Sequence, residues 1–127
     1  MRQTIRLFML AEGASFLAAS LVHAGALIPG YEHRQARIAE SIIAAVLLGG
    51  AVLTWLRPAS TRAVGLAAQG FALLGTLVGL FTIAVGIGPR TAPDLVYHAG
   101  IVAVLVWGLV VAARTRPVTQ VIGGGRE

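Results

Sequence analysis

Apolar residues fill four long stretches of this chain, and short segments rich in arginine and proline separate them. The stretches cover residues 7–28, 38–56, 63–87 and 95–113. About 20 apolar residues in an α-helix, at about 1.5 Å rise each, cross the roughly 30 Å hydrocarbon core of a bilayer. The pattern therefore predicts an all-α protein with four membrane-spanning helices.

The three connections between these stretches are short, at about residues 29–37, 57–62 and 88–94. Short connections make neighbouring helices antiparallel, which predicts an up-down-up-down four-helix bundle. We expect one transmembrane domain over residues 1–117. The tail over residues 118–127 contains three consecutive glycines and is expected to be flexible.

Composition supports a membrane protein and excludes several functions. Of 127 residues, 57% are hydrophobic and 12% are charged, whereas a water-soluble domain carries about 25% charged residues. The absence of cysteine excludes disulfides and thiolate metal sites. The net charge of +5 comes from arginines scattered at the ends of the apolar stretches. A basic groove with interleaved aromatic residues is absent, so no nucleic-acid partner is predicted.

The arginines predict an orientation, because cytoplasmic segments of membrane proteins carry an excess of positive charge. Seven arginines fall on the side of the chain termini and three on the opposite side. The first group is Arg2, Arg6, Arg57, Arg62, Arg114, Arg116 and Arg126, and the second is Arg34, Arg37 and Arg90. We therefore expect a multi-pass protein of the bacterial cytoplasmic membrane with both termini inside.

Two segments of the chain resemble each other. An offset of 58 residues aligns Ile43–Val52 with Ile101–Val110 and places Glu40 opposite His98. This similarity indicates either a duplicated two-helix hairpin, a common way to build membrane folds, or a coincidence between segments of similar composition. Glycines spaced four apart, Gly75 and Gly79, favour close helix packing and allow a homodimer.

Five polar residues interrupt the apolar stretches: Glu12, His23, Glu40, Gln69 and His98. An ionisable side chain in hydrocarbon costs about 2.5–3.5 kcal/mol, so each is expected to face the interior of the bundle. The topology places the histidines and Glu40 in the outer half, with His23 and His98 about one turn below the outer ends of their helices. Glu12 and Gln69 fall at similar depth in the inner half.

Three ligand hypotheses fit the outer residues. One is a transition-metal site with His23, Glu40 and His98 as ligands and His33 as a fourth candidate, because imidazole and carboxylate suit zinc, iron or copper. Another is a haem held between His23 and His98. The third is a pocket for a quinone or another small lipid-soluble molecule, in which Glu40 and the histidines handle protons.

A structural interpretation competes with these hypotheses. Glu40 then only pairs with His23 or His98, and a neutral Glu12 forms a buried polar pair with Gln69. Such links hold helices together at about 0.6 kcal/mol each. The protein would then be a non-catalytic accessory or scaffold subunit of a larger membrane complex. Known hydrolase, phosphate-loop and zinc-protease motifs are absent from the sequence, so no catalytic residues are predicted.

The layout resembles the DoxX-like group of small bacterial four-span membrane proteins. The likeness rests on Arg2 and Arg6 at the start, Glu12 in the first apolar stretch, and the step Ala39-Glu40-Ser41 in the second. It covers nearly the whole chain. Some members of that group are associated with quinone-linked redox systems, so the resemblance favours the pocket and redox hypotheses. It implies a role only for the matched acids, Glu12 and Glu40.

Overall fold

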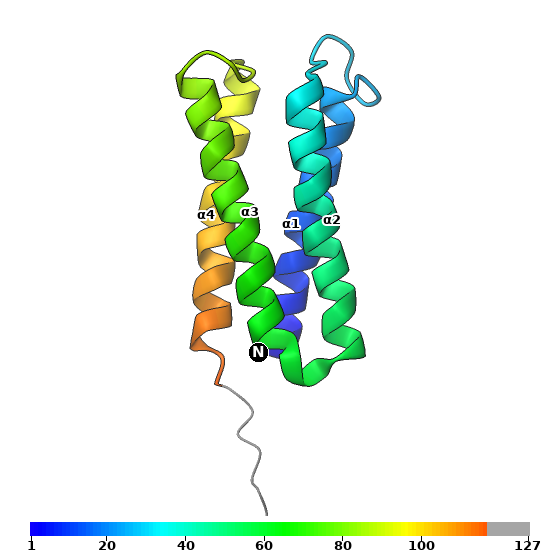
Figure 1. The fold of residues 1–127 in the computed structure, drawn as a ribbon, viewed down its shortest axis with the longest axis vertical. Coiled ribbons are helices and arrows are strands. Elements are labelled where there is room, and N and C mark those ends of the chain that lie inside the picture. The colour runs from blue at the N-terminus through cyan, green and yellow to red at the C-terminus, as the bar shows by residue number, and fades with distance from the viewer. Residues whose placement is uncertain (117–127) are drawn as a thin grey trace, which may run out of the picture.

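The computed structural model of the chain describes residues 1–116, and the predicted four-helix architecture is confirmed (Figure 1). A short 3-10 helix, η1 (Pro58–Ser60), joins the second helix to the third. The four long helices are α1 (Arg2–His23), α2 (Arg34–Leu56), α3 (Thr61–Ala84) and α4 (Ala92–Arg114). They run alternately up and down. The tail predicted over residues 118–127 lies outside the described residues.

Apart from the end of α2 at Leu56, the helices start and end at other residues than the apolar pattern predicts, and the largest difference is in α1. It begins at Arg2 and ends at His23, because Gly25 takes a left-handed conformation with φ +72° and turns the chain. His23 is therefore the last residue of its helix, and its expected position one turn deeper is wrong. At the start of α2 the His33 side chain accepts a hydrogen bond from the Ala36 N–H at 3.2 Å, which caps the helix.

The outer surface of the bundle is apolar. All four helices are long and apolar enough to cross a membrane. Large apolar side chains stand exposed along it, among them Leu74 at 67%, Phe81 at 66%, Val96 at 72% and Trp107 at 63%. Such a surface is unfavourable in water and favourable in lipid. The four apolar helices therefore fit a multi-pass membrane protein in contact with a bilayer.

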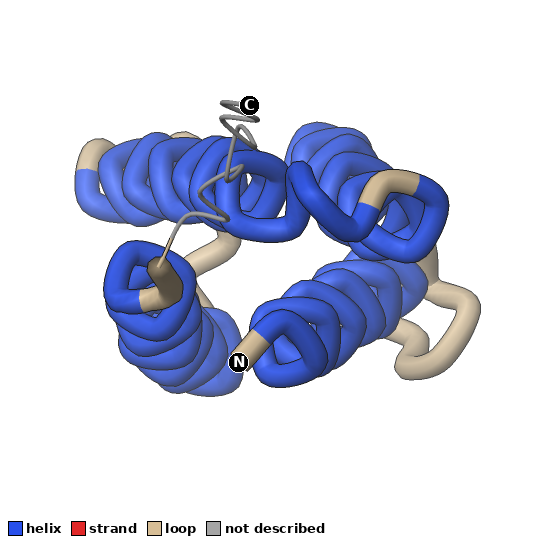
Figure 2. The backbone as a smooth tube through the Cα atoms, turned by 90° about the horizontal axis from the view of Figure 1, so that it is seen from below, coloured by secondary structure: helices blue, strands red, loops and turns tan. Residues whose placement is uncertain are grey.

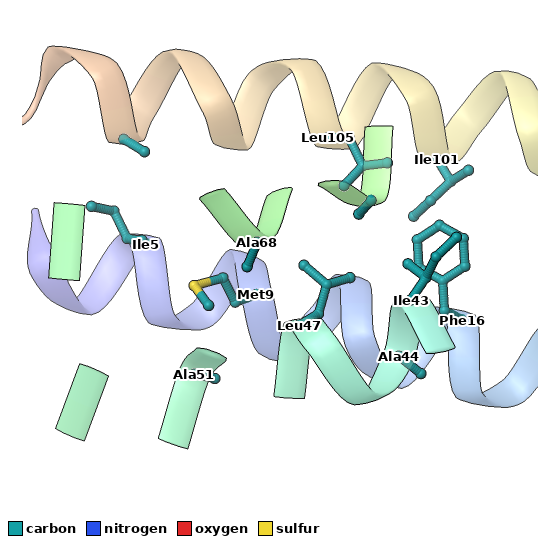
Figure 3. Close-up of a cluster of buried hydrophobic side chains, with 12 residues drawn as sticks. Ile5, Met9, Phe16, Ile43, Ala44, Leu47, Ala51, Ala68, Ile101 and Leu105 are labelled. Atoms are coloured by element: carbon teal, nitrogen blue, oxygen red, sulfur yellow. The ribbon is translucent and has the colours of Figure 1, made fainter. Parts of the chain in front are cut away.

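The helices form two antiparallel pairs, α1 with α2 and α3 with α4, arranged around a common interior (Figures 1 and 2). The core between them runs along most of the bundle and includes Ile5, Met9, Leu47 and Leu105 (Figure 3). Buried alanines such as Ala68 let the backbones approach closely, which is how helices associate in lipid. Both α1 and α3 begin, and both α2 and α4 end, at what we call the terminal end. The two pairs lie further apart at the opposite, distal end (Figure 1).

Candidate functional site: a buried histidine between two carboxylates and an adjoining pocket

At the distal end, the imidazole of His23 lies between two carboxyl groups from other helices. Its Nδ1 is 2.8 Å from Oε2 of Glu40 on α2, and its Nε2 is 3.2 Å from Oδ1 of Asp94 on α4. All three side chains are buried, with exposed fractions of 5%, 6% and 7% for His23, Glu40 and Asp94. We call these three residues the His23 cluster. It connects α1, α2 and α4.

Local sequence holds Asp94 in place. Thr91, Asp94 and the intervening Pro93 form the start of α4, where Thr91 and Asp94 make a reciprocal capping box. Oδ2 of Asp94 accepts hydrogen bonds from the backbone N–H and the hydroxyl of Thr91. Its other oxygen, Oδ1, is thereby left to meet His23. The carboxyl group that caps one helix is thus also the partner of a histidine on another.

Two serines near His23 and Glu40 hold α1 against α2. Ser20 on α1 and Ser41 on α2 share a hydrogen bond at 2.6 Å, and the Ser20 hydroxyl donates to the Arg37 carbonyl at 3.1 Å. These contacts set the register of α1 against α2. His23 and Glu40 then face each other, and the predicted pairing of Glu40 with His23 is confirmed.

Both ring nitrogens of His23 have a carboxyl partner. A neutral imidazole carries one N–H, yet both ring nitrogens here face carboxyl oxygens. Two hydrogen bonds therefore require either an imidazolium between two carboxylates or a neutral imidazole next to one protonated carboxyl group. In both cases the imidazole of His23 links the two carboxyl groups across three helices.

A third acid at the distal end, Glu32, lies at the surface. It belongs to the connection between α1 and α2, and its Oε2 accepts a hydrogen bond from the Gly30 N–H at 3.0 Å. Hydrogen bonds from the backbone N–H groups of Glu32 and Gly30 lower its pKa. Glu32 is thus a surface carboxylate that does not compete with Glu40 and Asp94 for His23.

Asp94 was not among the predicted site residues. It stands at the end of the connection that the apolar pattern assigned to residues 88–94. Two signals were available: the spacing Thr91-x-x-Asp94, which is typical of a helix start, and the four-residue separation from His98, which places both on one helical face. Its position beside His23 is a long-range contact, which neither signal determines.

The predicted metal ligands are not brought to one point. Both ring nitrogens of His23 face carboxyl groups, and His98 donates from Nδ1 to the Asp94 carbonyl at 2.7 Å. His33 uses Nδ1 as the cap of α2. Within residues 1–116, no group of three or more histidine or acidic side chains is placed to hold a metal ion. The geometry therefore does not support the metal hypothesis, nor a haem that needs a free nitrogen on both His23 and His98.

A pocket of about 320 Å³ adjoins the His23 cluster. It lies between α2 and α3 at the distal end, where the two helix pairs separate, and α4 contributes His98. Its walls are mainly apolar and include Phe16, Ile43, Val78, Ile83 and Ile87. The titratable side chains in its lining are His33, Glu40 and His98. The pocket therefore combines an apolar body with a small polar region.

Hydrogen bonds fix which polar atoms the pocket offers. Because a carbonyl only accepts, Nδ1 of His98 carries its proton, and in the neutral ring Nε2 is an acceptor. That atom lies 3.3 Å from the point where a Cβ on Gly79 would stand, so glycine keeps the space next to it open. The hydroxyls of Thr76 and Thr82 donate to carbonyls of their own helix. At His98 the pocket therefore offers an acceptor, beside the carboxyl group of Glu40.

Deeper in the bundle, Glu12 and Gln69 are both buried, but the described residues show no hydrogen bond between them. Both point at Gly108 of α4: a Cβ there would overlap Oε1 of Gln69 and stand 2.8 Å from Oε1 of Glu12. Gln69 donates from Nε2 to the Gly65 carbonyl at 3.0 Å. Both Glu12 oxygens and Oε1 of Gln69 are buried without a hydrogen-bond partner among the described residues.

No protein-family model, no curated protein and no solved structure matches this chain. The resemblance to the DoxX-like group therefore stays a prediction that rests on the residues quoted for it.

Proposed function

We propose that this protein binds a small lipid-soluble molecule with a ring hydroxyl, such as the reduced form of a quinone, in the distal pocket. The observation that carries the proposal is an apolar cavity of about 320 Å³ whose polar region presents the acceptor Nε2 of His98 next to Glu40. Small-molecule sites are typically apolar cavities of roughly 300–1,000 Å³ with a few placed polar groups. The pocket matches the lower end of that range and suits a single substituted ring.

The route into the pocket favours a ligand that is dissolved in the bilayer. Val78 and Ile87 line the cavity, and they are also 63% and 62% exposed on the outer surface of the bundle. The cavity thus meets the surface that faces lipid. A ring can enter sideways between α2 and α3 while an apolar tail stays in the hydrocarbon.

Glu40 connects the pocket to the His23 cluster. The same side chain lines the pocket and holds His23 through Oε2 at 2.8 Å. A hydroxyl bound beside His98 therefore lies next to a carboxyl group that also contacts His23. In this proposal the ligand's hydroxyl donates a hydrogen bond to Nε2 of His98 and keeps its proton. The resemblance to a group with quinone-linked members points the same way.

A second candidate function is that of a non-catalytic accessory subunit. It is favoured by the His23 cluster itself, in which all three side chains are engaged and join three helices. The two functions differ in the pocket. An accessory subunit would lose stability when the cluster is changed, but it would show no ligand whose binding depends on His98 or Gly79.

Binding of a short-chain hydroquinone tests the proposed function. We expect the detergent-purified protein to bind the hydroquinone more tightly than its dimethyl ether, which lacks the donor. His98→Leu should weaken hydroquinone binding about tenfold, because one hydrogen bond of about 1.4 kcal/mol is lost. Isothermal titration calorimetry of both compounds measures these differences.

Substitutions on α3 give the matched pair for this test. Gly79→Leu places a side chain against His98 and should abolish binding, whereas Gly70→Leu, where nothing lies within 4 Å, should leave binding unchanged. Equal affinity for hydroquinone and ether, or undiminished binding by the Gly79→Leu variant, would show that the pocket is not the site.

A further inference from the structure

A second hollow, of about 190 Å³, lies at the terminal end and is lined by arginines. Arg2 comes from the first turn of α1, Arg62 from the first turn of α3, and Arg116 from just beyond α4. Segments far apart in the sequence thus bring three arginines to one space. It is independent of the distal pocket and of the function proposed for it.

No carboxylate among residues 1–116 compensates these charges. The acids of that part of the chain are Glu12, Glu32, Glu40 and Asp94. Three of them lie at the distal end, and Glu12 is buried beside Gln69, so none lines the hollow. Like charges that converge without a counter-charge repel one another. An anion in the hollow would relieve this repulsion.

Arg62 has a donor group without a partner in the described residues. Its Nη2 donates to the Ala113 carbonyl at a long 3.4 Å, and its Nε is buried without a hydrogen-bond partner among the described residues. A buried donor that is left unpaired is unfavourable, and an anion oxygen would pair it. Arg6, at the same end, is in contrast fully engaged: it donates to the Thr54 carbonyl at 2.6 Å and stacks over Trp55.

The chemistry of the lining selects a phosphate group. Guanidinium groups present pairs of N–H donors that match phosphate oxygens. The two threonines of the lining add no donors, since Thr61 and Thr115 donate to the carbonyls of Pro58 and Val111. Recognition thus depends on charge and on the N–H groups of arginine. A singly charged phosphodiester with a small headgroup fits a hollow of about 190 Å³.

The position of the hollow indicates where that phosphate comes from. It lies where α1 and α3 begin and α4 ends, which in a bilayer is the depth of the lipid headgroups. Exposed apolar side chains at the same end, Met1 at 68% and Leu56 at 74%, leave surface for acyl chains. We propose that this hollow binds the headgroup phosphate of an anionic phospholipid through Arg2, Arg62 and Arg116.

Thermal unfolding of the detergent-purified full chain tests this site, with native mass spectrometry to count bound lipid. Phosphatidylglycerol should raise the unfolding temperature more than phosphatidylcholine does and should remain bound in the spectrometer. The double variant Arg62→Gln/Arg116→Gln should lose more than half of that difference. Arg57→Gln, which removes an arginine at the same end that does not line the hollow, should retain it.

Two further measurements distinguish lipid phosphate from free phosphate and cover the case in which the double variant does not fold. Inorganic phosphate should not reproduce the effect of phosphatidylglycerol; if it does, the site takes free phosphate and the lipid assignment is overturned. Arg116→Gln alone changes an exposed side chain and should reduce the lipid effect even where the double variant fails to fold. Equal responses of wild type and Arg116→Gln, or of the two lipids, would overturn the proposal.

Discussion

His23→Ala is expected to destabilise the protein by about 3–5 kcal/mol, the range seen when one partner of a buried ion pair is removed. The substitution leaves Glu40 and Asp94 facing an empty space in the interior, with exposed fractions of 6% and 7%. It also removes the one side chain that joins α1 to both α2 and α4 there. Unfolding in mixed micelles with increasing SDS measures the loss.

Two comparisons show whether the unpaired carboxyl groups cause this loss. His33→Asn changes another distal histidine but keeps an acceptor at the cap of α2, so it should be nearly neutral. The double variant His23→Ala/Glu40→Gln removes one of the carboxyl groups and should be more stable than His23→Ala alone. A double variant at least as unstable as the single one would mean that lost packing, and not unpaired charge, dominates.

Gly108→Leu is expected to destabilise the bundle by about 1–3 kcal/mol or more, the usual range for overpacking a filled core. A side chain at Gly108 must enter the space held by Gln69 and Glu12, whose exposed fractions are 0% and 1%. Movement of Gln69 would also strain its hydrogen bond to the Gly65 carbonyl. The same micelle unfolding assay measures the effect.

The control for this substitution lies on the same helix. Gly100 is exposed and a Cβ there meets nothing within 4 Å, so Gly100→Leu should be neutral or slightly stabilising through helix propensity. Gln69→Ala in the Gly108→Leu background should recover part of the lost stability, because it frees the space. No recovery would argue against a clash with Gln69 as the cause.

The sequence predicted that these polar residues are buried, but not which residues on other helices they contact. The cost of a charge in hydrocarbon places Glu12, His23, Glu40 and Gln69 in the interior from sequence alone, and the structure buries all four. Helical periodicity says which face a residue occupies, but not which residue on another helix it meets. Asp94 shows this limit, since its pairing with His23 spans 71 positions of the chain.

The residues of the metal hypothesis carry suitable donor atoms, but these atoms do not converge on one point. His23, Glu40 and His98 are the residue types that metals select, and a four-helix bundle brings their helices together. Coordination needs free nitrogen and oxygen atoms that converge on one point. Here backbone carbonyls and carboxyl groups already occupy Nδ1 of His98 and both nitrogens of His23.

By itself, the sequence determined the number of helices, their alternating direction and their apolar outer surface. These properties follow from local length and hydrophobicity, because an apolar segment that buries its own backbone polar groups must be a helix. The tertiary structure decided the His23 cluster, the pocket beside it and the arginine-lined hollow. Each of these depends on how helices distant in sequence pack, and packing is set by side-chain shape, which the apolar pattern does not encode.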